Sequence, residues 1–162
     1  MSAHRNTRLA GVGIVLALIV LSGAACSTQT PAAGTSFTNP NGQYSFVCPA
    51  AWKAAINQYN ADNSLYGPDA SGSSGLGGVE VFPNQTSIDA FLGGIGAQYT
   101  GTTNVTVDGV SGVRTQYAGS AVSGEQVVLL KGSILYNIYI NSQKSEDVEL
   151  FNQIVSTFKF TQ

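Results

Sequence analysis

Apolar and polar residues alternate with a period of two along much of the chain after residue 36, which is typical of β-strands with one buried face. Tyr44, Phe46 and Cys48 follow this alternation, and Pro49 ends the strand that they predict. A turn-forming segment at residues 39–42 separates this strand from a short one over residues 36–38, so we expect a first hairpin. Further strands are predicted over residues 79–82, 105–107, 110–117, 126–130, 134–140 and 158–160.

Helical spacing of apolar residues appears in two other segments. The first helix is expected to begin at a cap provided by Thr86 or Ser87, with an apolar face of Ile88, Phe91, Leu92, Ile95 and Tyr99. The second is expected to begin at Ser145, with a buried face of Val148, Phe151, Ile154 and Val155. Strands and helices in mixed order predict an α+β fold, with one antiparallel β-sheet of about six or seven strands flanked by two helices.

Two segments give less regular signals. Residues 51–59 fit either a short strand or one or two helical turns, and residues 60–78 form the longest irregular stretch of the domain. Long loops in compact domains are often functional. We therefore take Asp62 and Asp69 from this stretch as candidate ligand-binding residues, together with the aromatic Trp52 and Tyr66. The same stretch misses the EF-hand calcium pattern, so no metal ligands are assigned, and packing in the core is the alternative role of the two aromatic residues.

The first 25 residues have the pattern of a signal peptide. His4, Arg5 and Arg8 precede an uncharged apolar run that ends in small residues just before Cys26. Residues 23–26, Gly-Ala-Ala-Cys, resemble the lipobox of bacterial lipoproteins, although Gly23 stands where that pattern prefers an aliphatic residue.

The resemblance to a lipobox implies that Cys26 receives a lipid. The expected organisation is then a signal peptide over residues 1–25, a lipidated cysteine and flexible tether over 26–36, and a folded domain over 37–162. The protein would be anchored by palmitate-type acyl chains to the extracytoplasmic face of a bacterial cell membrane. Ordinary secretion after residue 25 is the alternative, and it would allow a disulfide between Cys26 and Cys48.

Composition excludes several functions. Of the seven Lys and Arg residues, Arg5 and Arg8 lie in the signal peptide, which leaves five cations against nine carboxylates and an excess of four negative charges. Nucleic-acid binding is not expected from so few scattered cations. The only histidine, His4, also lies in the signal peptide, so the exported chain cannot build a Ser-His-Asp, Cys-His or His-rich zinc site. No catalytic residues and no cofactor are expected, and the protein is interpreted as a non-enzyme.

Three motifs together resemble PsbP-like domains, the family that also includes Ran-binding nuclear import factors. They are Tyr44-Ser-Phe-Val-Cys-Pro49-Ala-Ala-Trp52, the segment Val107-Asp-Gly-Val-Ser-Gly-Val-Arg-Thr-Gln-Tyr117, and Ile154-Val-Ser-Thr-Phe-Lys-Phe160. The resemblance implies an α/β/α sandwich around an antiparallel sheet, and a protein that binds and assembles rather than catalyses. A non-catalytic binding or assembly module with a protein partner in the cell envelope is therefore expected. The alternative is a carrier of an apolar or lipid ligand.

Overall fold

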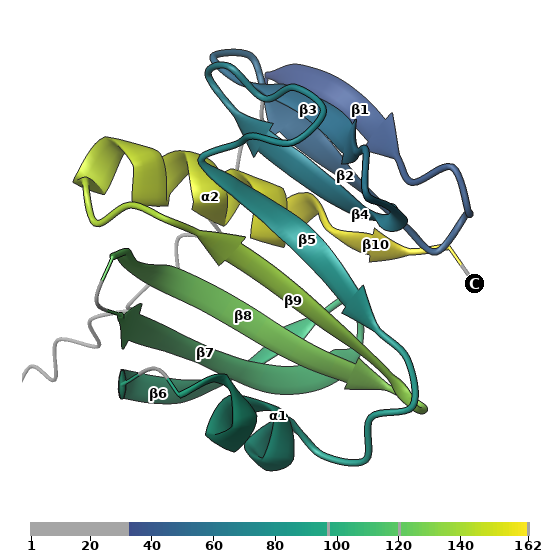
Figure 1. Cartoon of the computed structure of the whole chain (residues 1–162). Coiled ribbons are helices and arrows are strands. Elements are labelled where there is room, and N and C mark those ends of the chain that lie inside the picture. The colour runs from purple at the N-terminus through teal and green to yellow at the C-terminus, as the bar shows by residue number, and fades with distance from the viewer. Residues whose placement is uncertain (1–32, 97, 120, 162) are drawn as a thin grey trace, which may run out of the picture.

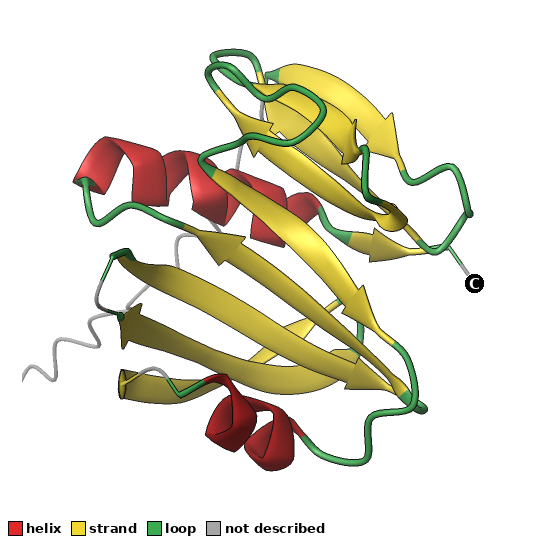
Figure 2. Cartoon of the chain, in the orientation of Figure 1, coloured by secondary structure: helices red, strands yellow, loops and turns green. Residues whose placement is uncertain are grey.

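The computed structural model describes residues 33–96, 98–119 and 121–161. The expected signal peptide, Cys26 and most of the expected tether lie outside the described residues. The described chain contains ten strands and two helices (Figures 1 and 2). In chain order they are β1 Gly34–Thr38, β2 Tyr44–Pro49, β3 Lys53–Asn57, β4 Asn60–Gly67, β5 Gly77–Phe82, α1 Ile88–Ile95, β6 Gln98–Val107, β7 Val110–Ala118, β8 Ser123–Lys131, β9 Ile134–Ile140, α2 Ser145–Thr157 and β10 Lys159–Phe160. This arrangement confirms the α+β class.

The strands form two antiparallel sheets where the pattern of the sequence predicted one. The larger sheet has seven strands in the order β3-β4-β5-β9-β8-β7-β6, and the smaller has three in the order β1-β2-β10. The division follows from the turn after β2, where Pro49 ends the strand and its carbonyl oxygen accepts a hydrogen bond from the Trp52 amide at 2.9 Å. This turn redirects the chain, so β3 pairs with β4 in the larger sheet and not with β2.

The hydrophobic core fills the space between one face of the seven-stranded sheet and a cover formed by α2 and the small sheet. Alternate residues of the central strands point into this space, and Val79, Ile138, Val127 and Leu129 are fully buried there. From the other side come Phe151 and Ile154 of α2 and the aromatic residues Tyr44 and Phe46 of β2. We call this face of the seven-stranded sheet the inner face.

The second face of the seven-stranded sheet, here called the outer face, carries α1. Phe91 of α1 packs on Phe82 of β5, with ring centroids 4.9 Å apart. Leu135 of β9 pairs with Phe82, and Val128 of β8 pairs with Asn137, two residues along β9 from Leu135. Val128 and Leu135 therefore point to the outer face, where they are fully buried. Because the two helices lie on opposite faces of the sheet, the domain is layered as helix, sheet, helix, with the small sheet beside α2 (Figure 2).

The first helix is shorter than predicted. Ser87 is its N-cap and accepts a hydrogen bond from the Ala90 amide, as expected, but the helix ends at Ile95 because Gly96 adopts a left-handed conformation with φ 69°. Tyr99 therefore lies in β6 and not on the helix. At the second helix the N-cap is Lys144 and not Ser145, and its side chain makes no capping hydrogen bond.

The region over residues 51–78 is more regular than predicted. The ambiguous first part contains β3, and residues 60–67 of the supposed irregular stretch form β4. The first residues of β4 are polar and show no alternation of apolar and polar positions, so the sequence pattern does not reveal the strand. Leu65 and Tyr66 at its end are buried. Only residues 68–76 remain as a loop between β4 and β5.

Candidate functional site

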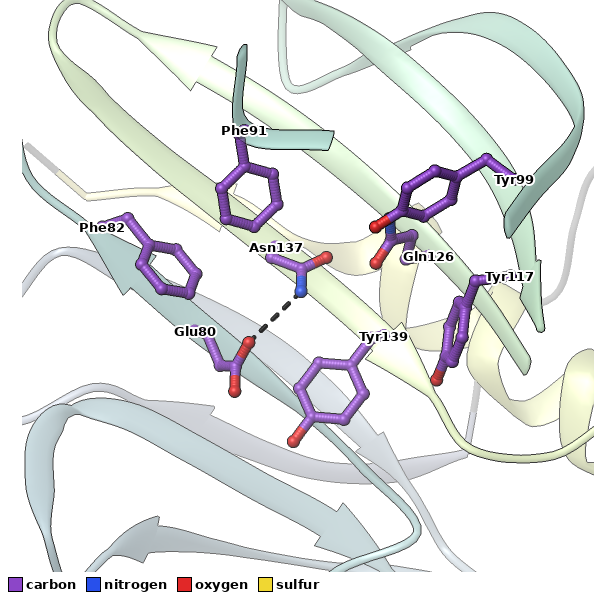
Figure 3. A pocket seen from close by; sticks show the side chains of 8 residues that line it. All are labelled: Glu80, Phe82, Phe91, Tyr99, Tyr117, Gln126, Asn137 and Tyr139. Atoms are coloured by element: carbon purple, nitrogen blue, oxygen red, sulfur yellow. Dashed lines mark hydrogen bonds between the residues drawn. The ribbon is translucent and has the colours of Figure 1, made fainter. Parts of the chain in front are cut away.

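A groove of about 350 Å³ lies on the outer face of the large sheet (Figure 3). This volume falls within the range of roughly 300–1,000 Å³ that is usual for small-molecule sites. Its walls come from six different elements: Glu80 and Phe82 of β5, Phe91 of α1, Tyr99 of β6, Tyr117 of β7, Gln126 of β8, and Asn137 and Tyr139 of β9.

Strand register brings these side chains to one face. Glu80 of β5 pairs with Asn137 of β9, and Tyr139, two residues further along β9, pairs with Gln126 of β8. Directly opposite residues and residues two apart on one strand point to the same face. The groove therefore runs across the adjacent strands β5, β9 and β8, of which β5 is distant from the other two in the sequence.

Glu80 is the only charged residue among the described side chains that line the groove. Its Oε2 accepts a hydrogen bond of 3.2 Å from Asn137 Nδ2. Burial raises the pKa of the Glu80 carboxyl above its ordinary value of 4.5, and the bond from Asn137 partly offsets this shift. The ion pairs found within the described ranges, Arg114–Glu125 and Lys159–Asp108, do not involve Glu80.

Two buried amides in the groove have an atom without a hydrogen-bond partner. Asn137 is 5% exposed and Gln126 is 4% exposed, yet Asn137 Oδ1 and Gln126 Nε2 make no hydrogen bond of acceptable geometry. The Gln126 amide lies beside the Tyr99 hydroxyl (Figure 3). An unsatisfied buried polar atom costs about 1–3 kcal/mol, and most such atoms in folded proteins are paired. Within the described chain, these two atoms are therefore left without a hydrogen-bond partner of good geometry.

The tyrosines contribute neutral hydroxyl groups to the groove. Burial raises the pKa of Tyr139 to about 12 and also raises the pKa values of Tyr99 and Tyr117. The Tyr117 hydroxyl donates to the Ile140 carbonyl oxygen at 2.9 Å and lies 2.5 Å from Asn141 Oδ1. Its ring is thereby fixed across β8, where residue 124 is a glycine.

The residues proposed from the sequence lie elsewhere. Trp52 and Tyr66 are brought together, but in the core, with ring centroids 5.8 Å apart and an interplanar angle of 10°. The Tyr66 hydroxyl donates to the Tyr139 carbonyl oxygen at 2.7 Å, and Trp52 also borders a second hollow of about 280 Å³ beside Cys48.

The two proposed carboxylates are not brought together. Asp62 is near the start of β4, where its Oδ1 accepts a hydrogen bond from Asn41 Nδ2, and Asp69 lies in the turn beyond the other end of that strand. Within the described ranges, no group of three or more His, Cys, Asp or Glu side chains could hold a metal ion. Ligand binding by these four residues stays a prediction.

The groove residues were missed because each belongs to a strand whose outward positions look like an ordinary solvated face. Tyr99 also continues the apolar spacing of the first helix, which hides its place in β6. A usable signal was present nevertheless. Tyr117 and Tyr139 are large aromatic residues at outward positions of strands that both pair with β8.

Comparisons with known proteins show only distant likenesses. No protein-family model matches the chain, and no curated protein matches it in sequence. Among solved structures, it is similar to the solution structure of cyanobacterial PsbP (CyanoP) from Synechocystis sp. PCC 6803, with 12% identity, a TM-score of 0.45, and coverage of 84% of this chain and 97% of that chain. A crystal structure from Bacteroides thetaiotaomicron VPI-5482 is similar at 12% identity and a TM-score of 0.41, over 80% of this chain and 49% of that one. Likenesses at this level establish neither a shared family nor a shared function.

The helices α1 and α2, in the described part of the chain, are too short or too polar to cross a membrane.

Proposed function

We propose that the folded domain is a non-catalytic module that binds a small, partly apolar molecule in the outer-face groove. A lipid on Cys26 would hold this module on the extracytoplasmic side of a bacterial membrane. The observation that carries the proposal is the pair of unsatisfied buried amide atoms, Asn137 Oδ1 and Gln126 Nε2, in an aromatic groove of ligand size.

The lining matches the chemistry of small-molecule sites. Such sites combine aromatic walls with a few polar groups that fix the orientation of the ligand. Phe82 and Phe91 form an apolar end, while Glu80 and the two amides supply the polar groups (Figure 3). This lining favours a carrier of an apolar ligand over a module that binds only proteins. The carrier is the alternative function that the sequence left open.

We propose a non-catalytic module because of the titratable groups that line the groove and because of the composition of the chain. Among the described residues that line the groove, Glu80 has the only carboxyl group, so the groove provides no pair of carboxylates for general acid and base chemistry. Histidine is absent after His4. The tyrosine hydroxyls remain protonated at neutral pH because burial raises their pKa values.

Ligand-observed NMR with a fragment library tests the binding role. We expect the purified protein to give saturation-transfer signals from apolar fragments, and Phe91→Ala to weaken them because it removes one aromatic wall. Tyr59→Ala is the matched control, since Tyr59 is 80% exposed and lies in the β3–β4 turn. The proposal is wrong if no fragment binds, or if Phe91→Ala binds as the unaltered protein does.

A separate experiment tests the membrane anchor. Cells that express the protein are fed a palmitate analogue, and we expect label on the protein that is lost in Cys26→Ala. Membrane fractionation should place the unaltered protein with the membrane and the variant in the soluble fraction. Absence of label on the unaltered protein would instead support ordinary secretion. Crosslinking on intact cells followed by mass spectrometry then identifies the expected envelope partner.

A further inference from the structure

The groove contains a negative charge that no cation of the described chain neutralises. Glu80 is partly buried, and the hydrogen bond that its carboxylate accepts within the described chain comes from the neutral amide of Asn137. Burying a carboxylate is costly unless a cation or several hydrogen bonds compensate it. By contrast, Glu125 of β8 and Asp108 of the β6–β7 turn each have a cationic partner. A cation from outside the chain would therefore form its most favourable electrostatic contact at Glu80.

A second acceptor lies beside this carboxylate. Asn137 uses Nδ2 to reach Glu80, which turns its Oδ1 away from Glu80, and this oxygen has no partner although the side chain is 5% exposed (Figure 3). The groove therefore offers two acceptors on the paired residues Glu80 and Asn137, one of them charged. A protonated primary amine has three donors and no acceptor, so it complements both groups at once.

The surroundings of the two acceptors favour an organic cation over a metal ion. Phe82 lies two residues from Glu80 on the same face of β5, and its ring packs on Phe91 at 4.9 Å. Aromatic faces attract ammonium groups and pack against apolar skeletons. In contrast, the described residues provide no cluster of metal ligands here.

We infer that the groove binds a small primary amine with an aromatic or similarly apolar body. The ammonium group would pair with the Glu80 carboxylate beside Asn137, and the body would lie against Phe82 and Phe91. This inference rests on the proposed function and narrows it. Anionic molecules are disfavoured because Glu80 repels them, and neutral molecules leave the carboxylate without a counterion.

Isothermal titration calorimetry with three ligands of one skeleton tests the inference. The probes are tryptamine, tryptophol and indole-3-acetate, which carry a cationic, a neutral and an anionic group on the same indole. We expect tryptamine to bind at least about tenfold more tightly than tryptophol, because hydrogen bonds between charged groups are stronger than those to a neutral donor. Indole-3-acetate should bind most weakly. Equal affinities for the three probes, or no binding of tryptamine, would overturn the inference.

The Glu80→Gln variant tests whether the preference for tryptamine over tryptophol depends on this carboxylate. The variant keeps the shape and a hydrogen-bond acceptor for Asn137, so we expect about a tenfold or greater loss for tryptamine and little change for tryptophol. Glu149→Gln is the matched control, since Glu149 is exposed on α2 across the sheet from the groove, and it should leave both affinities unchanged. Equal tryptamine affinity in Glu80→Gln and the unaltered protein would refute the assignment.

A pH series on the unaltered protein provides a second readout that needs no variant at Glu80. Between about pH 7 and pH 4, tryptamine affinity should fall as Glu80 is protonated. The other titratable groups that line the groove, Tyr99, Tyr117 and Tyr139, stay protonated over this range. A constant affinity would contradict the inference. If fragments still bind in the groove but amines are not preferred, only this inference fails, whereas the proposed function fails if nothing binds there.

Discussion

Each helix packs a phenylalanine against the large sheet, Phe151 on the inner face and Phe91 on the outer face, and the two residues have different roles. Phe151 of α2 is fully buried in the core, and Phe91 of α1 is a partly exposed wall of the groove. Replacing each by alanine is therefore a matched pair of perturbations. We predict a large loss of stability for Phe151→Ala and a small loss for Phe91→Ala.

The magnitudes follow from what each ring contacts. Truncation of a fully buried phenylalanine costs about 3–5 kcal/mol. At Phe151 the Arg114 guanidinium lies 5.7 Å from the ring centroid, so a cation–π contact is lost as well. Phe91 stays partly exposed and packs on Phe82, for which we expect a loss of roughly 1–2 kcal/mol. Since domains of this kind are stable by about 5–15 kcal/mol, both variants should still fold.

Urea unfolding followed by tryptophan fluorescence measures both values. Trp52 is the only tryptophan of the chain, and it is buried against Tyr66 in the core, so its emission reports the loss of core packing. The free energy of unfolding is obtained by linear extrapolation, with the slope expected to remain unchanged between variants. Phe91→Ala should show the smaller shift in midpoint.

Two results would refute this reasoning. If Phe91→Ala loses as much stability as Phe151→Ala, the outer face is a second core and its groove is a packing defect. If Phe151→Ala loses less than about 1 kcal/mol, the space between α2 and the sheet is not the main core.

Three further predictions concern the sheet and α1. Because burial raises the pKa of Glu80 in the folded state, its carboxylate opposes folding as pH rises through that value. Glu80→Gln should therefore melt at a higher temperature than the unaltered protein at pH 7. Calorimetry should show that this gain in melting temperature disappears below pH 4.5, the ordinary pKa of the carboxyl group. A gain that persists below pH 4.5 would contradict the raised pKa of Glu80. Gly124→Ala should lose about 3 kcal/mol in urea unfolding because its methyl group would overlap the Ile140 carbonyl oxygen, and a neutral effect would contradict the β8–β9 pairing. Gly93→Ala, in contrast, meets open space on α1 and should gain about 0.5–1 kcal/mol by the same assay, whereas a loss would argue against a helix there.

Local signals in the sequence predicted the elements that depend on near neighbours. Asp108-Gly109 is a hairpin turn as expected, with both residues at positive φ, 49° and 79°, which is typical of a type I′ turn. The strands on either side and the cap at Ser87 were found for the same reason. A left-handed Gly96 was harder to foresee, because Tyr99 continues the helical spacing of apolar residues although it lies in a strand.

The groove could not be predicted because it depends on strand order. β5 is followed along the chain by α1 and β6, but its neighbour in the sheet is β9, which begins 52 residues after the end of β5 by residue number. Glu80 and Asn137 are opposite one another only through this pairing. The same holds for Asp108, which accepts hydrogen bonds from Lys159 Nζ and the Phe160 amide at the far end of the chain. Period-two alternation shows which residues share a face of one strand but not which strand lies beside it.

The division into two sheets also lay beyond local signals. Tyr44 and Trp52 belong to one motif of the sequence, yet they lie on opposite sides of the Pro49 turn, in segments that lead to different sheets. Both are buried in the common core. Aromatic residues that close a core between two sheets resemble aromatic residues of a ligand groove in sequence, so Trp52 and Tyr66 were natural candidates.

The central claim is that the outer-face groove binds a small molecule through its unsatisfied amides. The most direct measurement follows the side-chain amide NMR signals of Asn137 and Gln126 during titration with tryptamine or with a binder from the fragment library. Asn39 is the internal control, because its buried amide already donates to the carbonyl oxygens of Ala61 and Asp62 at the other side of the domain. We predict saturable shifts of the Asn137 and Gln126 signals and none of the Asn39 signal. Saturable binding that leaves Asn137 and Gln126 unshifted would contradict the account.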